Sequence, residues 1–163
     1  MLTFEDISEH IISKDKYKSL MNDKHHGLNR YIHSIKVAMN TYNIAKFLHL
    51  DYISATRGAL LHDYFNDFEY EGKKGLQKPL THPGLALKNA KIEYDLNKIE
   101  ENIIISHMFP FGKVIPNCFE SWLVTTVDKV VAINECVCFK LKDELILKII
   151  FVINILSFKL NYL

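Results

Sequence analysis

Four of the eight histidines in this 163-residue chain form an ordered series with two aspartates. Imidazole nitrogens and carboxylate oxygens hold Mn, Fe, Zn and similar divalent ions at neutral pH. A carboxylate can also bridge two ions, which an imidazole nitrogen cannot do. In chain order the candidate metal ligands are His33, His62, Asp63, His82, His107 and Asp128. We expect ordinary surface or hydrogen-bonded positions for the other histidines, His10, His25, His26 and His49.

Two of the candidate ligands, His62 and Asp63, are adjacent, so on a helix their directions differ by about 100°. Both side chains can still reach one ion where the helix ends, because side chains have room to converge there. Small residues occupy the same face one and two turns earlier, at Ala55, Gly58 and Ala59. Since glycine lowers helix stability by roughly 1 kcal/mol relative to alanine, this pattern predicts close approach of another helix, such as the one that carries His33.

The elements that must position these residues all read as helices, which predicts an all-α fold, a single compact bundle of about six or seven helices. Apolar residues recur at helical spacing from Leu28 to Leu50, without proline or glycine. Asp51 is the predicted N-cap of a following helix that runs through Phe65. After a break over 66–80, further helices are expected from Pro83 to about Tyr94, from a capping box at Asn97–Glu100 and from another at Asn117–Glu120, and one more is expected over 3–21.

Composition excludes several classes of function. Apolar residues make up 48% of the chain and charged residues 24%, and 20 Lys and Arg against 19 Asp and Glu give a net charge of +1. That balance excludes a strongly basic surface, so no binding of nucleic-acid duplexes is expected. The three cysteines form neither a disulfide framework nor a Cys-x-x-Cys zinc site, and no signal-peptide pattern opens the chain. We therefore predict one cytoplasmic domain over residues 1–163.

The chain ends in an apolar stretch that we predict as a helix over about 143–163. A membrane-spanning helix needs roughly 20 apolar residues, and Lys148, Asn154 and Lys159 leave no clean run of that length. No transmembrane span is therefore expected. The favoured interpretation is a core helix or a surface through which the chain forms a homo-oligomer, and contact with a membrane is the alternative.

The histidine and aspartate series resembles the HD-domain superfamily of metal-dependent phosphohydrolases. The resemblance covers about residues 28–135 and implies an all-α bundle of five or more helices. It rests on five segments, Arg30–Ala38, Gly58–Asp63, Thr81–Gly84, Ile103–His107 and Val127–Lys129.

The resemblance to the six-ligand subgroup of that superfamily implies a site for two divalent ions, such as Mn or Fe. One ion would be held by His33, His62 and Asp128 and the other by His82 and His107, with Asp63 as a catalytic bridge. The implied activity is hydrolysis of a small phosphate ester, often a nucleotide or dinucleotide, by a hydroxide held between the ions.

Helix ends are expected at the two histidines of the second ion. His82 would stand at the start of the helix that Pro83 opens, and His107 lies near the end of a helix that must stop before Pro110. Two neutral imidazoles alone make a weak site. The second ion is therefore expected to bind more weakly than the first.

Candidate phosphate-binding residues are basic groups near the series. Many members of the superfamily carry a lysine three residues after the HD aspartate, whereas this chain has Asn66 there and Asp67 next. Arg30 lies one turn before the first histidine of the series, on the same helix face. Its planar guanidinium could bind phosphate and act in catalysis, or form an ordinary salt bridge. Lys73 and Lys74 could belong to a substrate-binding lid or to a solvated loop.

Other assignments stay open at this point. The same six ligands serve HD-type diiron oxygenases, which activate O₂, and a chain of this fold could also bind nucleotides without catalysis. The intact ligand set argues against the non-catalytic alternative but does not separate hydrolase from oxygenase. Aromatic residues at 65–70 and 108–111 could line a pocket for a base, although filling of the core is favoured. Lys129 is expected to be structural, paired with an acidic neighbour.

Overall fold

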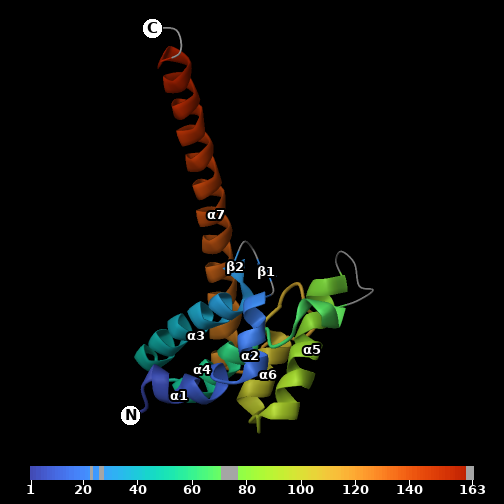
Figure 1. Ribbon diagram of the computed structural model, residues 1–163. Coiled ribbons are helices and arrows are strands. Elements are labelled where there is room, and N and C mark those ends of the chain that lie inside the picture. Colours follow the sequence, from blue (N-terminus) through green and yellow to red (C-terminus); the bar gives the residue numbers. More distant parts are fainter. Residues whose placement is uncertain (23, 26–27, 71–76, 161–163) are drawn as a thin grey trace.

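The computed structural model describes residues 1–22, 24–25, 28–70 and 77–160 of the chain. These residues are mostly helical, and the predicted all-α class is confirmed (Figure 1). The α-helices of this part of the chain are α1 (Phe4–Ile12), α2 (Asp15–Ser19), α3 (Arg30–Phe47), α4 (Tyr52–Leu61), α5 (Gln77–Glu93), α6 (Lys98–Ser106) and α7 (Phe119–Leu160). The remaining elements are 3₁₀ turns at Leu20–Asn22 and Asp67–Tyr70 and two short antiparallel strands, β1 (Lys24–His25) and β2 (Leu28–Asn29).

The N-terminal segment differs from the single helix predicted over 3–21. α1 begins with a capping box, in which Thr3 and Asp6 each accept a hydrogen bond from the other's backbone N–H. The backbone becomes extended at Lys14, and the short helix α2 starts after it. Tyr17 in α2 is fully buried, like Ile11 in α1. The apolar pattern therefore continues through a backbone break that its periodicity does not reveal.

Two predicted helix starts are confirmed. The carboxylate of Asp51 caps α4 by accepting hydrogen bonds from the backbone N–H and the hydroxyl of Ser54. At the start of α6, Asn97 and Glu100 form the predicted capping box, with distances of 2.9 and 3.0 Å. These caps satisfy backbone N–H groups that have no partner within the helix itself.

Two other predicted helix starts are wrong. α5 begins at Gln77, so Pro83 lies inside the helix. Pro79 instead occupies the first turn, where its missing N–H removes no helical hydrogen bond. α7 begins at Phe119, and the carboxylate of Glu120 accepts the backbone N–H of the α4 cap residue at 3.1 Å instead of closing a capping box.

Helix α4 lies at the centre of the bundle and contacts α1, α3, α6 and α7 (Figure 1). Ala55 and Leu60 of α4 are fully buried. At Gly58 an added Cβ would come within 2.8 Å of Ile103 Cδ1 in α6. The atoms nearest to this glycine therefore belong to α6, while α3, which carries His33, also packs against α4 as expected.

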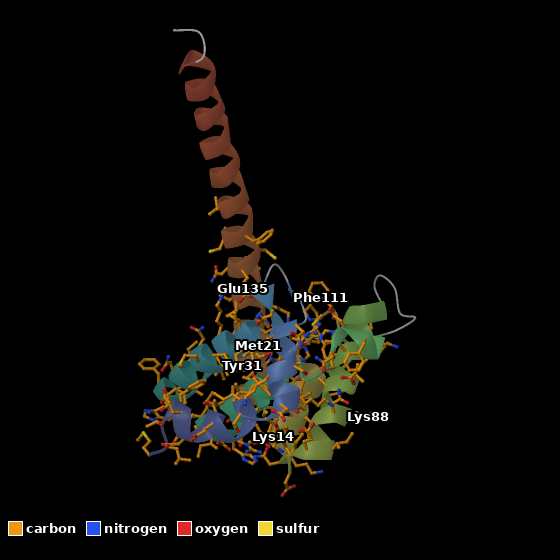
Figure 2. All side chains as sticks on the ribbon, in the orientation of Figure 1. Lys14, Met21, Tyr31, Lys88, Phe111 and Glu135 are labelled. Carbon is orange, nitrogen blue, oxygen red and sulfur yellow. The ribbon has the colours of Figure 1, made fainter. Side chains whose placement is uncertain are left out.

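α7 is the longest helix, and only its first part belongs to the bundle. Val124, Val127 and Val131 are buried in the core. Glu135 lies near the point where the helix leaves the bundle (Figure 2). From there α7 projects away as far as Leu160, with no other helix beside its outer part (Figure 1). Of the two favoured interpretations of the C-terminal stretch, packing as a core helix of the bundle does not fit this projecting backbone, and a surface for forming a homo-oligomer stays a prediction.

In that part of the chain, no helix combines the length and the apolar character that a membrane span requires.

Candidate metal centre

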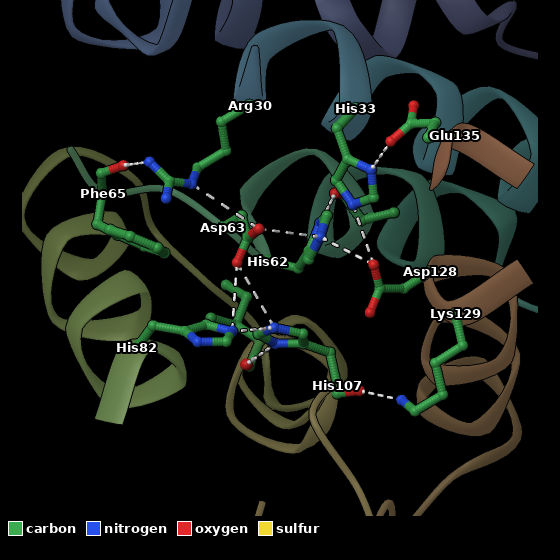
Figure 3. A network of polar contacts seen from close by, with 12 residues as sticks. Arg30, His33, His62, Asp63, Phe65, His82, His107, Asp128, Lys129 and Glu135 are labelled. Carbon is green, nitrogen blue, oxygen red and sulfur yellow. Dashed lines mark hydrogen bonds and ion pairs between the residues drawn. The ribbon is translucent and has the colours of Figure 1, made fainter. Parts of the chain in front are cut away.

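Five helices bring the six candidate ligands into one buried cluster (Figure 3). Each of the six residues is at most 8% exposed. Since α4 ends at Leu61, the two adjacent ligands after it turn into the same space, as predicted for a helix end. The contributing elements are the first turn of α3 (His33), the end of α4 (His62 and Asp63), α5 (His82), the end of α6 (His107) and α7 (Asp128).

The first cluster consists of His33, His62 and Asp128. Oδ1 of Asp128 lies 3.0 Å from Nε2 of His33 and 3.6 Å from Nε2 of His62. Oδ2 of Asp63 is 3.8 Å from the same nitrogen of His62. Ligand atoms that bind one ion at about 2.1 Å are about 3 to 4 Å apart in tetrahedral or octahedral geometry. The spacing of these atoms therefore fits a single divalent ion.

The ring of His62 is oriented by the end of its own helix. Its Nδ1–H donates to the carbonyl of Ala59 at 2.7 Å, so in the neutral ring the lone pair lies on Nε2. That Nε2 atom is buried and has no hydrogen-bond partner within the described part of the chain. Burial of such a group is unfavourable unless a partner occupies the space in front of it. A divalent ion between the ligand atoms would supply that partner.

Glu135 supports the first cluster, although it is not among the residues predicted from the sequence. Its Oε2 lies 2.9 Å from Nδ1 of His33, and its Oε1 accepts a hydrogen bond from Nζ of Lys36 at 3.1 Å. The carboxylate is buried and holds the N–H of the ring, which directs Nε2 of His33 towards Asp128. A signal was present in the sequence, because Glu135 follows Asp128 by two helical turns on the same face.

The second cluster consists of His82, His107 and Oδ1 of Asp63. The Nε2 atoms of the two histidines are 2.8 Å apart and lie 3.4 and 3.6 Å from that oxygen. The Nδ1–H of His107 donates to the carbonyl of Ile104 at 2.8 Å, so its Nε2 carries the lone pair. Asp63 therefore lies between the clusters, with one oxygen towards each of them (Figure 3).

His82 does not stand at the start of its helix, because α5 begins at Gln77. The ring of Phe65 packs against its imidazole instead, with the ring centroids 5.5 Å apart. His107, by contrast, is the C-cap of α6, at a helix end as predicted. Only one of the two expected helix-end positions in the second cluster is therefore present.

The first cluster stabilises positive charge. Burial lowers the pKa of His33, but hydrogen bonds with Asp128 and Glu135 outweigh burial and raise it to about 10. The pKa of His62 is also raised against the effect of burial, through Asp63 and Asp128. Burial raises the pKa of Asp128, yet the two histidines hold it well below its usual value. The carboxylate remains ionised and attracts a cation.

The second cluster favours neutral imidazole. Burial, followed by the neighbouring His82 and His62, lowers the pKa of His107 to about 3. Asp63 opposes this shift but does not cancel it. The imidazoles of the second cluster can therefore offer lone pairs to an ion. Of the three residues in this cluster, Asp63 supplies the negative charge.

Arg30 reaches the site with its guanidinium already engaged. Its Nε lies 3.9 Å from Oδ2 of Asp63, while its other nitrogens donate to the Phe65 carbonyl at 3.2 Å and to Asp67 Oδ1 at 3.0 Å. The guanidinium also stacks on the Phe65 ring, 4.0 Å from the centroid. Of the two roles considered for Arg30, the structure describes the salt bridge. A phosphate bound at the same edge would have to displace Asp67, which is exposed.

Lys73 and Lys74 lie outside the residues that the structure describes, so their role in a lid stays a prediction. Lys129 is structural as expected, but its partners differ from the acidic neighbour predicted. Its Nζ donates to the carbonyls of His107 at 2.8 Å and Thr125 at 3.1 Å. Lys129 therefore ties α7 to the end of α6.

The aromatic residues near the site are divided between core and surface. Phe65 is buried against the Arg30 side chain, and Phe109 packs edge-on against Trp122 with centroids 5.4 Å apart. Phe68 and Phe111 are 69% and 68% exposed. The favoured interpretation as core residues therefore holds for Phe65 and fails for the two exposed rings.

Comparison of the chain with protein-family models, curated proteins and solved structures found no match.

Proposed function

We propose that this chain is a metal-dependent phosphohydrolase of the HD-domain type with two divalent ions, Mn, Fe or similar. The observation that carries the proposal is the position of Asp63. Its Oδ2 lies 3.8 Å from Nε2 of His62, and its Oδ1 lies within 3.6 Å of Nε2 in both His82 and His107. A carboxylate with one oxygen directed at each of two imidazole groups is the arrangement that a pair of ions requires.

The tautomers of the histidine rings support this proposal. In His62 and His107 the Nδ1–H is donated to a backbone carbonyl, which leaves Nε2 as the ligand atom. In His33 the Nδ1–H faces the carboxylate of Glu135. Partners of this kind orient metal-binding histidines and raise their basicity. Three rings are thus held with Nε2 directed into the cluster.

Bound divalent ions would supply Lewis acidity and lower the pKa of a coordinated water towards neutrality. The chain itself contributes positioning. Glu135 keeps a proton on Nδ1 of His33, and the guanidinium of Arg30 lies beside Oδ2 of Asp63 and restrains that carboxylate. The proposed substrate is a small phosphate ester, a nucleotide or dinucleotide, because an anionic phosphoryl group complements two cations.

The test is metal analysis followed by activity measurement. Protein purified without added metal is reconstituted with Mn²⁺ or Fe²⁺ and assayed on nucleoside monophosphates, dinucleoside polyphosphates and p-nitrophenyl phosphate, under air and under nitrogen. We expect phosphate or nucleotide release that requires the metal and is equal under both gases. The matched variants are His62→Ala, which should abolish release, and His10→Ala, which removes an exposed histidine and should not.

Two results would overturn the proposal. Turnover by the iron-loaded protein that disappears under nitrogen would assign the site to the diiron oxygenases. Saturable nucleotide binding without turnover under any metal would assign the chain to non-catalytic nucleotide binding.

A further inference from the structure

Arg30 directs two edges of its guanidinium to different partners. Nη1 donates to the carbonyl of Phe65 at 3.2 Å, and the Phe65 ring lies against the flat face, with its centroid 4.0 Å from Cζ. Nε and Nη2 share the other edge, where Nε lies 3.9 Å from Oδ2 of Asp63 and Nη2 donates to Oδ1 of Asp67 at 3.0 Å. Phe65 therefore fixes the orientation of the guanidinium, and the edge that Asp67 covers is the one that faces the carboxylate between the two clusters (Figure 3).

The two partners of the ion pair between Arg30 and Asp67 differ in burial. The side chain of Arg30 is 5% exposed, whereas that of Asp67 is 54% exposed. A carboxylate that leaves this pair regains its hydration at once. The guanidinium is shielded from water, so the charge of a departing carboxylate is best replaced by that of another anion. The pair is therefore suited to exchange of one anion for another.

The turn that carries Asp67 is anchored through Glu69. The carboxylate of Glu69 accepts the backbone N–H of Asn66 at 3.0 Å and the side-chain N–H of Asn89 in α5 at 2.7 Å. These hydrogen bonds hold the 3₁₀ turn Asp67–Tyr70 against the bundle. Rotation of one exposed side chain therefore vacates the edge of Arg30 while the backbone of the turn stays in place.

We propose that Asp67 is an internal competitor for phosphate. In the absence of substrate its carboxylate occupies the edge of Arg30 that a phosphoryl group takes on binding. The inference rests on the proposed function and names a residue that sets affinity at the same site. The ligand is inorganic phosphate or a phosphate monoester, because carboxylate and phosphoryl groups both offer oxygens to the paired N–H groups of a guanidinium. A phosphoryl group on this edge lies beside Asp63.

A permanent structural ion pair is the alternative role for Asp67, and it predicts the opposite effect of removing the charge. If Asp67 only held Arg30 in place, its loss would loosen the guanidinium and weaken the binding of phosphate. Internal competition predicts stronger binding, because phosphate no longer displaces a carboxylate. The direction of the change in phosphate affinity therefore distinguishes the two roles.

Calorimetric titration with inorganic phosphate measures that direction. The Mn²⁺-reconstituted chain is compared with its Asp67→Asn variant at equal ionic strength. The amide keeps an acceptor for Nη2 and removes the charge. We expect the dissociation constant for phosphate to fall about fivefold, a modest factor because the carboxylate is exposed to water. Asp95→Asn is the matched control, since Asp95 is an exposed carboxylate on another part of the surface, and it should change the constant by less than about twofold.

The double variant Arg30→Gln/Asp67→Asn shows whether Asp67 acts through Arg30. Without the guanidinium Asp67 has no cation to cover, so Arg30→Gln and the double variant should bind phosphate equally weakly. Metal content and helical circular dichroism show whether these variants fold. Arg30→Lys is a second background for the same comparison, because it keeps a positive charge beside Asp63 and removes the paired N–H edge. The gain from Asp67→Asn should be smaller there than with Arg30 present.

The results separate this inference from the proposed function. An unchanged or raised dissociation constant in Asp67→Asn overturns the inference, even where the reconstituted chain releases phosphate from esters. An equal gain in the Arg30→Gln background also overturns it, because the effect would then be one of overall charge. The absence of phosphate binding in every variant has the same meaning. Tighter binding by Asp67→Asn that is lost with Arg30→Gln supports the competitor, and it does so even in a chain that hydrolyses no ester and so is not a hydrolase.

Discussion

The two clusters of the candidate metal centre use similar residue types and differ in the charge that surrounds them. The first cluster contains a carboxylate of its own, Asp128, and a further carboxylate, Glu135, lies behind His33. The second cluster combines two imidazoles with one oxygen of the shared Asp63. Affinity for a cation rises with the number of anionic groups directed at it, so if both clusters hold ions, we expect the first to bind its ion more strongly than the second.

One ring in each cluster, His62 in the first and His107 in the second, is held by the same hydrogen bond, so the difference between these two rings is the charge around them. His62 and His107 each follow the last residue of a helix, and each donates Nδ1–H to the carbonyl three residues earlier, at 2.7 and 2.8 Å. The pKa values nevertheless shift in opposite directions, upward for His62 and downward for His107. Carboxylates near the first ring and imidazoles near the second account for this contrast.

The largest effect is expected from Asp63→Ala, because both clusters lose a ligand atom. We expect metal content to fall from two ions per chain to none after gel filtration and turnover to fall about 1000-fold or more. Mass spectrometry of bound metal and a phosphate-release assay measure the two effects. Asp95→Ala, at an exposed carboxylate, is the control. Wild-type turnover by Asp63→Ala would place the chemistry elsewhere in the molecule.

The double variant His82→Ala/His107→Ala should remove the weaker ion alone. Titration with Mn²⁺ should then give one ion per chain where the unchanged protein takes two, and turnover should fall greatly while circular dichroism is unchanged. The stronger ion is retained because its four ligands, His33, His62, Asp128 and Oδ2 of Asp63, are all untouched. One ion per chain in the unchanged protein at saturating Mn²⁺ would mean that the second cluster is packing and not a metal site.

A smaller effect is expected from Glu135→Gln, which should lower the metal affinity of the first cluster and leave that of the second cluster unchanged. The amide oxygen can still accept the Nδ1–H of His33, but the negative charge is lost. We expect affinity for the stronger ion to fall about 10-fold, with the weaker ion unaffected, measured by competition with a metal chelator. Glu120→Gln is the control, because Glu120 is also a buried carboxylate on α7 and bonds to Asp51 instead of a histidine. Equal losses in both variants would contradict a role specific to His33.

The sequence predicts the candidate ligands more accurately than it predicts the boundaries of the helices that hold them. The order of His33, His62, Asp63 and Asp128 was readable because few residue types bind metal, and the structure brings these residues together. Glu135 was not readable in the same way, since a glutamate on a helix is usually solvated and its burial depends on the packing of α7 against α3.

The wrong predictions came from contacts made across the bundle. Glu120 has the spacing of a capping residue, but its carboxylate reaches α4 instead of its own helix end. Pro83 was predicted in the first turn of a helix. In the structure Pro79 lies in the first turn of α5, and Pro83 lies inside the helix. Residue spacing along the chain indicates which capping or helix-start positions are possible. Contacts between helices determine which of these positions is used.

The smallest effect on the site is expected from Gly58→Ala. This substitution changes a distance within the second cluster and leaves the charges of both clusters as they are. An added Cβ would lie 2.8 Å from Cδ1 and 2.9 Å from Cγ2 of Ile103, so α4 and α6 must move apart slightly. The movement lengthens the 3.6 Å contact between Asp63 and His107 while the contact of His33 with Asp128 does not involve α6. We expect the free energy of unfolding to fall by about 1–3 kcal/mol and affinity for the weaker ion to fall about threefold.

Thermal unfolding and Mn²⁺ titration measure these two quantities for Gly58→Ala. In Gly58→Ala/Ile103→Ala the two closest atoms, Cδ1 and Cγ2, are gone and only Cβ at 3.0 Å remains, so most of the affinity for the weaker ion should return even where stability does not. Affinity for the stronger ion should stay constant in both variants, because its remaining ligands lie on α3, α7 and the end of α4. If both affinities fell together in Gly58→Ala, the two clusters would form a single site whose parts cannot be weakened separately.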